Sequence, residues 1–223
     1  MGTDDLHHKR KAKKARELVR RKARRASYAK VLIVCEGEKT EPNYFKGMID
    51  HYELNSANVE IADHRGADPI GIFTHARQRY REMKDMGDPF DRIYCVFDKD
   101  THAKYQESLD AIARATPPKT YFAINSVPCF EYWLLLHFTY TCKPYQSLAD
   151  CSACGQISSD LKHYLPDYTK GERDTFSKLI DQLQFAKENA ARALREAESN
   201  RTDNPSTKVH ELVKFLQNIN QKA

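Results

Sequence analysis

One short apolar stretch with acidic residues directly after it constrains this chain most. Residues 31–35 are all apolar, and they run directly into Glu36-Gly37-Glu38-Lys39-Thr40-Glu41. A run of this length, rich in β-branched side chains and ended by a glycine turn, predicts a strand that is buried on both faces. Open α/β sheets bind their ligands at the carboxyl ends of such strands. We therefore expect Glu36 and Glu41 at a ligand-binding edge.

A second stretch repeats this arrangement, because the apolar residues 93–97 lead into Asp98-Lys99-Asp100. Around these two stretches, apolar spacing and Gly or Pro breaks predict strands and helices in alternation. The strands are expected at 31–35, 58–64, 91–97 and 121–124, and the helices at 40–51, 69–86, 101–115 and 130–138. Four strand–helix units predict an α/β fold with a mostly parallel sheet and helices on both faces.

The chain divides into three parts by composition. We expect a basic arm over 1–28, an α/β core over 29–138 and a mostly helical C-terminal region over 139–223 that packs on the core. In the last part a short helix is predicted near 157–164 and a long one over 173–198. A turn at 125–128 and a helix cap at Asn204-Pro205-Ser206-Thr207 complete the prediction.

The basic charge is confined to the arm. The whole chain carries +5, but residues 1–25 hold eleven Lys or Arg against three acidic residues, so the remainder carries −3. A basic run can bind nucleic-acid phosphates through counterion release, and a solubilising tail is the alternative. The arm residues that we expect to bind nucleic acid are Arg10, Lys14, Arg21, Arg24 and Arg25.

Targeting signals are not apparent, so we expect a cytoplasmic protein with no membrane partner. No stretch approaches the roughly 18 apolar residues of a membrane span, and the basic N-terminus lacks the apolar core of a secretory signal. The six cysteines do not have disulfide-framework spacing, which favours reduced thiols. For Cys142, Cys151, Cys154 and His163 we prefer ordinary cysteines over structural Zn²⁺.

The acidic residues after the two strands predict a metal site if those strands are neighbours. Glu36, Glu41, Asp98 and Asp100 would then converge, and carboxylate oxygens are the ligands that Mg²⁺ or Mn²⁺ prefers. Without a cation, so many close anions would repel one another and raise their pKa values. Such a metal suits phosphoryl chemistry. The alternative for each motif is a solvated loop or a helix cap.

Four segments carry a resemblance to a known family. They are Cys35-Glu36-Gly37-Glu38-Lys39-Thr40-Glu41-Pro42-Asn43-Tyr44-Phe45, Phe97-Asp98-Lys99-Asp100, Asn125-Ser126-Val127-Pro128-Cys129-Phe130-Glu131-Tyr132-Trp133-Leu134-Leu135-Leu136-His137 and Asn204-Pro205-Ser206-Thr207. With them the chain, from about residue 30 onward, resembles the RloB family, a prokaryotic family with a toprim-like domain. The resemblance implies a toprim-like, Rossmann-type sheet with a helical C-terminal extension.

The resemblance also implies a set of site residues. In toprim domains a glutamate after the first strand and a later Asp-x-Asp hold divalent metal, which corresponds here to Glu36, Asp98 and Asp100. The OLD-type branch of toprim nucleases adds a further acid, a serine/acid pair and a lysine. Candidates for these are Glu41, Ser126 with Glu131, and Lys170.

The physical roles of the candidates divide as follows. Glu41 and Glu131 would ligate a second metal or act as general base on water, and Lys170 would stabilise negative charge in the transition state. Lys39 would hold the scissile phosphate. Simpler alternatives are that Glu131 begins a helix and that Lys170 is a solvated loop lysine. We interpret His137 as a buried, hydrogen-bonded histidine.

The predicted function is a metal-dependent nuclease acting on DNA or RNA. The resemblance also implies a partner, an SMC-like or AAA-type ATPase (RloA), and a role in defence against phage. One alternative is a non-catalytic regulatory or nucleic-acid-binding subunit of such a complex. A lesser alternative is a haloacid-dehalogenase-type phosphatase, because Asp98-x-Asp100-Thr101 also fits its nucleophile loop. A homo-oligomer stays open.

Overall fold

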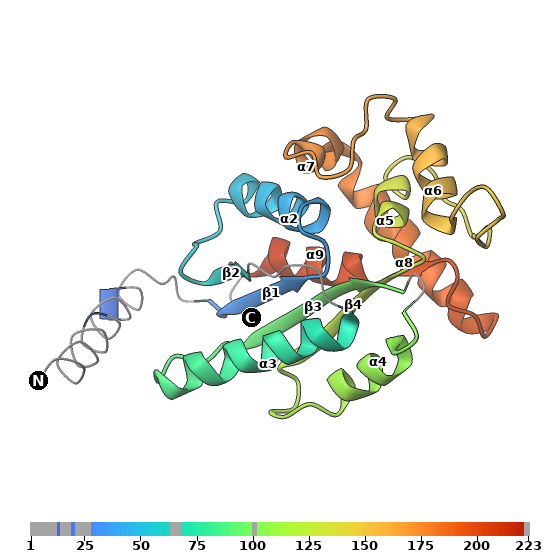
Figure 1. Ribbon diagram of the computed structural model, residues 1–223. Coiled ribbons are helices and arrows are strands. Elements are labelled where there is room, and N and C mark those ends of the chain that lie inside the picture. The colour runs from blue at the N-terminus through green and yellow to red at the C-terminus, as the bar shows by residue number, and fades with distance from the viewer. Residues whose placement is uncertain (1–12, 14–18, 21–27, 63–67, 100–101, 221–223) are drawn as a thin grey trace, which may run out of the picture.

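The computed structural model describes residues 13, 19–20, 28–62, 68–99 and 102–220. Within them, five strands form one sheet in the order β2-β1-β3-β4-β5 (Figure 1). They are β1 (Val31–Cys35), β2 (Val59–Ala62), β3 (Arg92–Asp98), β4 (Tyr121–Val127) and β5 (Ser206–Thr207). The first four are parallel, and β5 is antiparallel to β4. The predicted mixed α/β fold with a mostly parallel sheet is thereby confirmed.

The sheet has its topological switch point between β1 and β3. From β1 the chain passes to β2 on one side, and it then crosses to β3 on the other side. Cys35 at the end of β1 lies opposite Val96, and Asp98 at the end of β3 lies opposite Ser126. Ligands of open α/β sheets bind at the carboxyl edge of such a switch point. The fold therefore places the predicted acidic residues of both strands at one edge.

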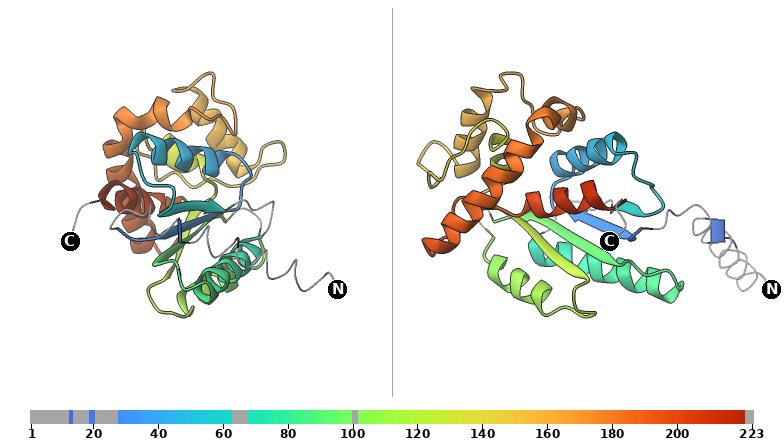
Figure 2. Two further views of the ribbon diagram at one scale, coloured as in Figure 1. Left: turned by 90° about the vertical axis from the view of Figure 1, so that its left-hand side faces the viewer. Right: turned by 180° about the vertical axis from the view of Figure 1, so that it is seen from behind.

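Helices cover both faces of the sheet, so its strands are buried on both sides. Along β1, Leu32 and Val34 pack on one face with α3 (Pro69–Asp85) and α4 (Tyr105–Ala113). Val31 and Ile33 point to the other face, which α2 (Thr40–His51) and α9 (Val209–Asn218) cover (Figures 1 and 2). Alternate side chains of each strand thus enter two separate cores, which explains the continuous apolar runs.

A group of helices follows β4 and stands at one end of the sheet (Figure 1). It comprises α5 (Glu131–Leu135), α6 (Ala153–Lys162), α7 (Thr175–Leu179), a 3₁₀ turn η1 (Ile180–Gln182) and α8 (Leu183–Ser199). Trp133 of α5 and Phe176 of α7 are buried against Tyr44 of α2 in the larger core. Edge-to-face aromatic packing therefore ties the C-terminal region to the sheet's helical layer.

Several predicted boundaries were wrong. Strand β4 continues through Val127, where a turn was expected, and residues 206–207 form β5 where a helix cap was expected. The predicted helix over 173–198 is divided by η1 into α7 and α8. The helix predicted from residue 101 begins at Tyr105, and residues 63–64 of the second predicted strand lie outside the described residues.

No helix in the described part of the chain combines the length and the apolar character needed to span a membrane.

Candidate functional site

Glu36 and Asp98 meet at the switch point, where β1 and β3 end. The backbone N–H of Glu36 donates to the carbonyl of Val96 (2.9 Å), which extends the pairing of the strands by one residue. The Glu36 carboxylate then accepts the backbone N–H of Asp98 at Oε2 (2.9 Å), and its Oε1 lies 2.6 Å from Nε2 of His102. The first glutamate and the aspartate are thus joined directly.

Glu41, in the first turn of α2, folds back over the glycine turn. A Cβ atom at Gly37 would lie 2.1 Å from Oε2 of Glu41, so only glycine leaves room for this carboxylate. Glu41 is buried. Burial raises its pKa to about 7, the N–H groups of Glu41 and Gly37 oppose that shift, and the charges of Glu131 and Glu36 add to it. Glu41 therefore belongs to the same acidic cluster.

Asp98 is the most strongly perturbed member of this cluster. Burial raises the pKa of Asp98 well above its ordinary value, and the charges of Glu41, Glu131 and Glu36 raise it further. A hydrogen bond from the backbone N–H of Phe130 opposes the shift. Four carboxylates therefore interact electrostatically at one edge of the sheet, one directly after β1, one in α2, one at the end of β3 and one in α5. We refer to Glu36, Glu41, Asp98 and Glu131 as the acidic cluster.

Glu131 begins α5, and its buried carboxylate has two partners. Nζ of Lys170 lies 2.8 Å from Oε1, and the hydroxyl of Tyr168 donates to the same oxygen (3.3 Å). The Glu131 side chain is 3% exposed, whereas that of Lys170 is 59% exposed. Partial burial lowers the pKa of Lys170, but the Glu131 carboxylate outweighs it, so the pKa is raised. Lys170 stays a cation that solvent or a ligand can reach.

A glycine holds the Lys170 segment in place. Gly171 has φ +83°, and a Cβ atom there would lie 2.8 Å from Cβ of Lys39. Its carbonyl accepts a hydrogen bond from Nδ2 of Asn43 in α2 (2.7 Å). The segment therefore docks on α2, although it lies far from α2 in the sequence, and this contact places Lys170 beside Glu131.

The remaining predicted residues lie at different distances from the acidic cluster. Lys39 is exposed in the turn after β1. The buried hydroxyl of Ser126 is shared with Thr207 of β5 (2.9 Å), which gives it a structural partner. His137 is buried, with Nδ1 3.0 Å from the carbonyl of Trp133, as expected, and burial lowers its pKa to about 4. Asp100 and the arm residues Arg10, Lys14, Arg21, Arg24 and Arg25 lie outside the described residues.

The cysteines expected to be ordinary thiols form no disulfide among the described residues. Cys142 is exposed, and Cys151 and Cys154 are partly buried. Cys154 shares a hydrogen bond with Cys129, from the loop before α5, and this bond together with burial raises the pKa of Cys129. His163 is exposed at the end of α6, where its Nδ1 lies 3.3 Å from the carbonyl of Asp160.

The donor chemistry of the acidic cluster suits a hard divalent cation. In the described part of the chain, Lys170 forms an ion pair with Glu131 and His102 lies on Glu36, whereas Glu41 and Asp98 form no ion pair. Ionising all four carboxylates would therefore leave negative charge in excess. Among the described residues, no group of three or more His, Cys, Asp or Glu side chains is arranged to hold a metal ion. Glu36 is turned toward His102 and the Asp98 N–H, and Asp100 is not described. The residues fit such a cation by chemistry, with Glu36 hydrogen-bonded inside the protein.

Reasoning from the sequence missed His102 and Tyr168. His102 is a single histidine in the loop after β3, and Tyr168 lies in the irregular segment before Lys170. Both are recognised through contacts with carboxylates, His102 with Glu36 and Tyr168 with Glu131. Proximity to Asp98 in the sequence was a signal for His102, and no signal marked Tyr168.

Comparison with known proteins places the chain in a family. No curated protein and no solved structure gives a significant match. The family model described as RloB-like protein matches residues 31–216, which include every member of the acidic cluster and Lys170. On this match over most of its length, the chain belongs to the family of RloB-like proteins.

Proposed function

We propose that this protein is a metal-dependent nuclease that hydrolyses phosphodiester bonds of DNA or RNA. The observation that carries the proposal is the meeting of Glu36, Glu41, Asp98 and Glu131 at the switch point of the sheet, with Lys170 on Glu131. Structural charges are normally balanced by their neighbours, whereas strongly perturbed acids in a group are typical of functional sites. The proposal takes the site to be toprim-like, since acids lie at the ends of β1 and β3.

Mg²⁺ or Mn²⁺ would be held by Glu36, Asp98 and Glu41, together with Asp100. When bound, such a cation lowers the pKa of a coordinated water and stabilises charge on the leaving oxygen. The excess of negative charge at the acidic cluster is the reason to expect a cation, since burial and mutual repulsion both disfavour the ionised carboxylates.

The protein's own residues supply the other roles. Glu41 has a second role as the alternative to ligating metal: burial raises its pKa to about 7 in the metal-free protein, which suits a group that takes a proton from an attacking water at neutral pH. Glu131 holds Lys170, whose exposed ammonium can stabilise negative charge on a phosphate. Lys39, exposed in the glycine turn, can hold a neighbouring phosphate as a point charge.

Membership of the family supports a wider biological proposal. We propose that the nuclease serves prokaryotic defence against phage, and that an RloA-like ATPase controls it in the cytoplasm. The roles proposed for Glu131 and Lys170 follow those of the OLD-type toprim nucleases, which the chain resembles.

One specific observation favours a second candidate, a non-catalytic regulatory or nucleic-acid-binding subunit of the same complex. Glu36 and Glu131 have hydrogen-bonding partners within the protein, in His102 and Asp98 for the first and in Lys170 and Tyr168 for the second. Those partners satisfy the carboxylates without a metal. The haloacid-dehalogenase alternative has no such support, because Asp98 follows the third strand of the domain.

Cleavage assays decide between these candidates. The purified protein, alone and with an RloA-like ATPase, is incubated with DNA and RNA in Mg²⁺ or Mn²⁺. Asp98→Asn should reduce cleavage at least about 100-fold, because it removes a carboxylate at the centre of the cluster. Glu38→Gln is the matched control, since Glu38 is exposed in the same turn. Cleavage that survives Asp98→Asn, or that is absent with every substrate, contradicts the nuclease proposal.

A further inference from the structure

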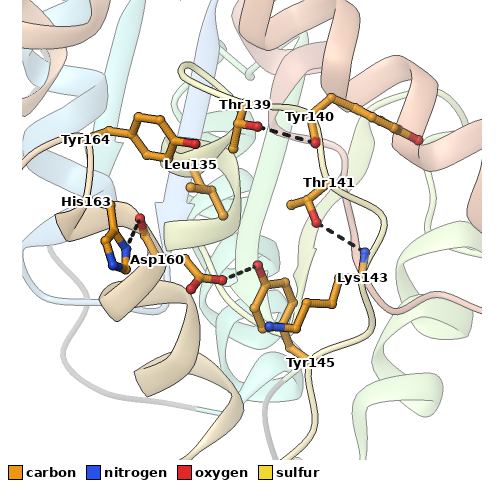
Figure 3. A pocket seen from close by; sticks show the side chains of 9 residues that line it. All are labelled: Leu135, Thr139, Tyr140, Thr141, Lys143, Tyr145, Asp160, His163 and Tyr164. Carbon is orange, nitrogen blue, oxygen red and sulfur yellow. Dashed lines mark hydrogen bonds between the residues drawn. The ribbon is translucent and has the colours of Figure 1, made fainter.

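A cavity of about 310 Å³ opens at the end of α5 and has no role in the site described above. It lies between the end of α5, the segment that follows it and the end of α6 (Figure 3). Five of its side chains carry a hydroxyl, and only one is aliphatic. The lining residues are Leu135, Thr139, Tyr140, Thr141, Lys143, Tyr145, Asp160, His163 and Tyr164. We call this space the tyrosine cavity.

The tyrosine cavity presents polar groups with unused hydrogen-bonding capacity. The hydroxyl of Tyr145 donates to Oδ2 of Asp160 (2.8 Å), which fixes the orientation of that carboxylate. Within the described part of the chain, Oδ1 of Asp160 and the hydroxyl of Tyr164 form no hydrogen bond. A fixed acceptor and a free hydroxyl beside aromatic rings suit a planar, polar ligand.

The aromatic and basic groups of the cavity suit a nucleotide. The ring of Tyr164 is stacked on Phe138 (centroids 5.4 Å apart, planes 7° apart) and is 48% exposed, so its second face is accessible. Nζ of Lys143 lies over the ring of Tyr145, 5.2 Å from its centroid, and has no carboxylate partner among the described residues. Exposed tyrosine rings stack with bases, and lysines at such rings attract phosphate.

A second cavity of about 240 Å³ shares Tyr145 with the tyrosine cavity and has Lys99, which directly follows Asp98, in its lining. The ammonium of Lys99 is paired with the Asp203 carboxylate (2.7 Å), and Tyr145 is buried. The exposed ring and the lysine without a carboxylate partner among the described residues are therefore those of the tyrosine cavity, Tyr164 and Lys143. Helix α5 relates this cavity to the acidic cluster along the chain, with Glu131 at its first residue and Leu135 at its last.

We infer that the tyrosine cavity receives one base of a single strand of nucleic acid. The inference rests on the proposed function and names its substrate class. In a duplex the bases are stacked and paired, so a base must leave the stack before it can enter a cavity. A single strand offers its bases freely. An exposed tyrosine ring with a lysine close by (Tyr164 and Lys143) is the kind of surface that binds such strands.

The Asp160 carboxylate adds a preference among bases. An acceptor in the cavity requires a donor on the base edge. Cytosine offers an amino group, whereas thymine places carbonyl oxygens on both sides of its single N–H, and these repel a carboxylate. We therefore expect a base with an exocyclic amine in the tyrosine cavity.

Binding is measured by fluorescence anisotropy with the full chain carrying Asp98→Asn, so that cleavage does not consume the probe. The probes are labelled oligo(dC), oligo(dT) and a duplex, each of about 12 nucleotides, which is within the usual site size for single strands. Oligo(dC) should bind more tightly than oligo(dT) and more tightly than the duplex. Tyr164→Ala should weaken binding of oligo(dC) at least about five-fold, and Tyr164→Phe should retain it because the ring still stacks.

Two controls make the result specific. Phe185→Ala removes an equally exposed ring (46%) from α8 and should leave binding unchanged. Asp160→Ala should abolish the preference for oligo(dC) over oligo(dT), and circular dichroism confirms that each variant is folded. If Tyr164→Ala and Lys143→Ala both bind oligo(dC) like their parent, or if the duplex binds more tightly, the inference is overturned. That outcome does not bear on cleavage by the protein in which Asp98 is retained. Conversely, absence of cleavage with single-strand binding intact overturns only the nuclease proposal.

Discussion

The two edges of the sheet use charge in opposite ways. At the amino edge, the ammonium of Lys30, just before β1, donates to Oδ2 (2.7 Å) and the carbonyl (2.8 Å) of Asp88. Both side chains are about 5% exposed. The backbone N–H of Lys30 donates to Oδ2 of Asp91, just before β3 (2.7 Å). Buried charges at this edge are paired within the protein, and they hold the starts of the two central strands together.

At the carboxyl edge, the same two strands end in a charge imbalance. Glu36, Glu41, Asp98 and Glu131 meet there, and burial, together with the repulsion among them, raises the pKa values of Glu41 and Asp98. The two edges of the sheet, although built from the same strands, therefore differ in how their buried charges are balanced. The balanced edge stabilises the fold, whereas the unbalanced edge costs stability and is suited to a cationic ligand.

Breaking the amino-edge pair should have the largest effect on stability. Lys30→Met removes the main cation beside the buried Asp88 carboxylate, and the loss of one partner of a buried pair costs about 3–5 kcal/mol. The free energy of unfolding is measured by urea denaturation monitored by circular dichroism.

The matched control removes the other charge as well. Lys30→Met combined with Asp88→Asn should recover part of the lost stability, because no buried charge is then left without its partner. A single Lys30→Met variant that is as stable as the parent would show that the amino edge does not depend on this pair.

Removing a charge from the carboxyl edge should stabilise the fold, in contrast to Lys30→Met, and the effect should depend on pH. In the metal-free protein Glu41 keeps its proton up to about pH 7, whereas in the unfolded chain it loses it near pH 4.5. Unfolding therefore releases a proton between these values, and the stability of the parent falls as pH rises through this window. The glutamine of Glu41→Gln has no such proton to lose. Its free energy of unfolding should therefore fall less than that of the parent, by at most about 3 kcal/mol.

Urea denaturation in EDTA at pH 5 and pH 8 measures this difference. The parent should lose more stability between the two values than Glu41→Gln does, and Glu38→Gln should follow the parent because its side chain is exposed. A parent and a Glu41→Gln variant with identical pH dependence would mean that Glu41 is not strained by its neighbours.

Two glycines with similar backbone conformations provide a smaller, matched test. Gly87 after α3 has φ +73° with free space around it, whereas Gly171 has φ +83° and Lys39 in the way of a Cβ atom. Gly87→Ala should cost about 1 kcal/mol from backbone strain alone. Gly171→Ala should cost more and should also reduce cleavage, because it displaces the segment that carries Lys170. Equal stability and equal cleavage in the two variants would show that the contact of Gly171 with α2 does not position Lys170.

Much of this comparison could be predicted from the sequence. The apolar runs of β1 and β3 end in acidic residues, and the condition for these residues to converge, that the two strands are neighbours, is met by their pairing. The two-residue strand β5 was missed because its residues read as a helix cap, and Thr207 does accept the N–H of Val209 (3.2 Å). One residue thus serves both a strand and the start of α9.

Other features depend on contacts between segments distant in the sequence. The break between α7 and α8 was not predicted, because Phe176, Leu179 and Leu183 keep helical spacing through η1. His102 lies on Glu36 as a consequence of the path of the loop after β3, and Tyr168 lies on Glu131 through the docking of Gly171. Periodicity records neither of these contacts, since it reports on one element at a time.

The most direct test of the account is whether the carboxyl edge binds a divalent cation. Mn²⁺ is titrated by isothermal calorimetry into metal-free protein, into Asp98→Asn and into Glu38→Gln, all at the same pH. The account predicts saturable heat for the parent and for Glu38→Gln, and loss of that heat in Asp98→Asn. No saturable heat in the parent, or equal heat in the parent and in Asp98→Asn, would contradict it.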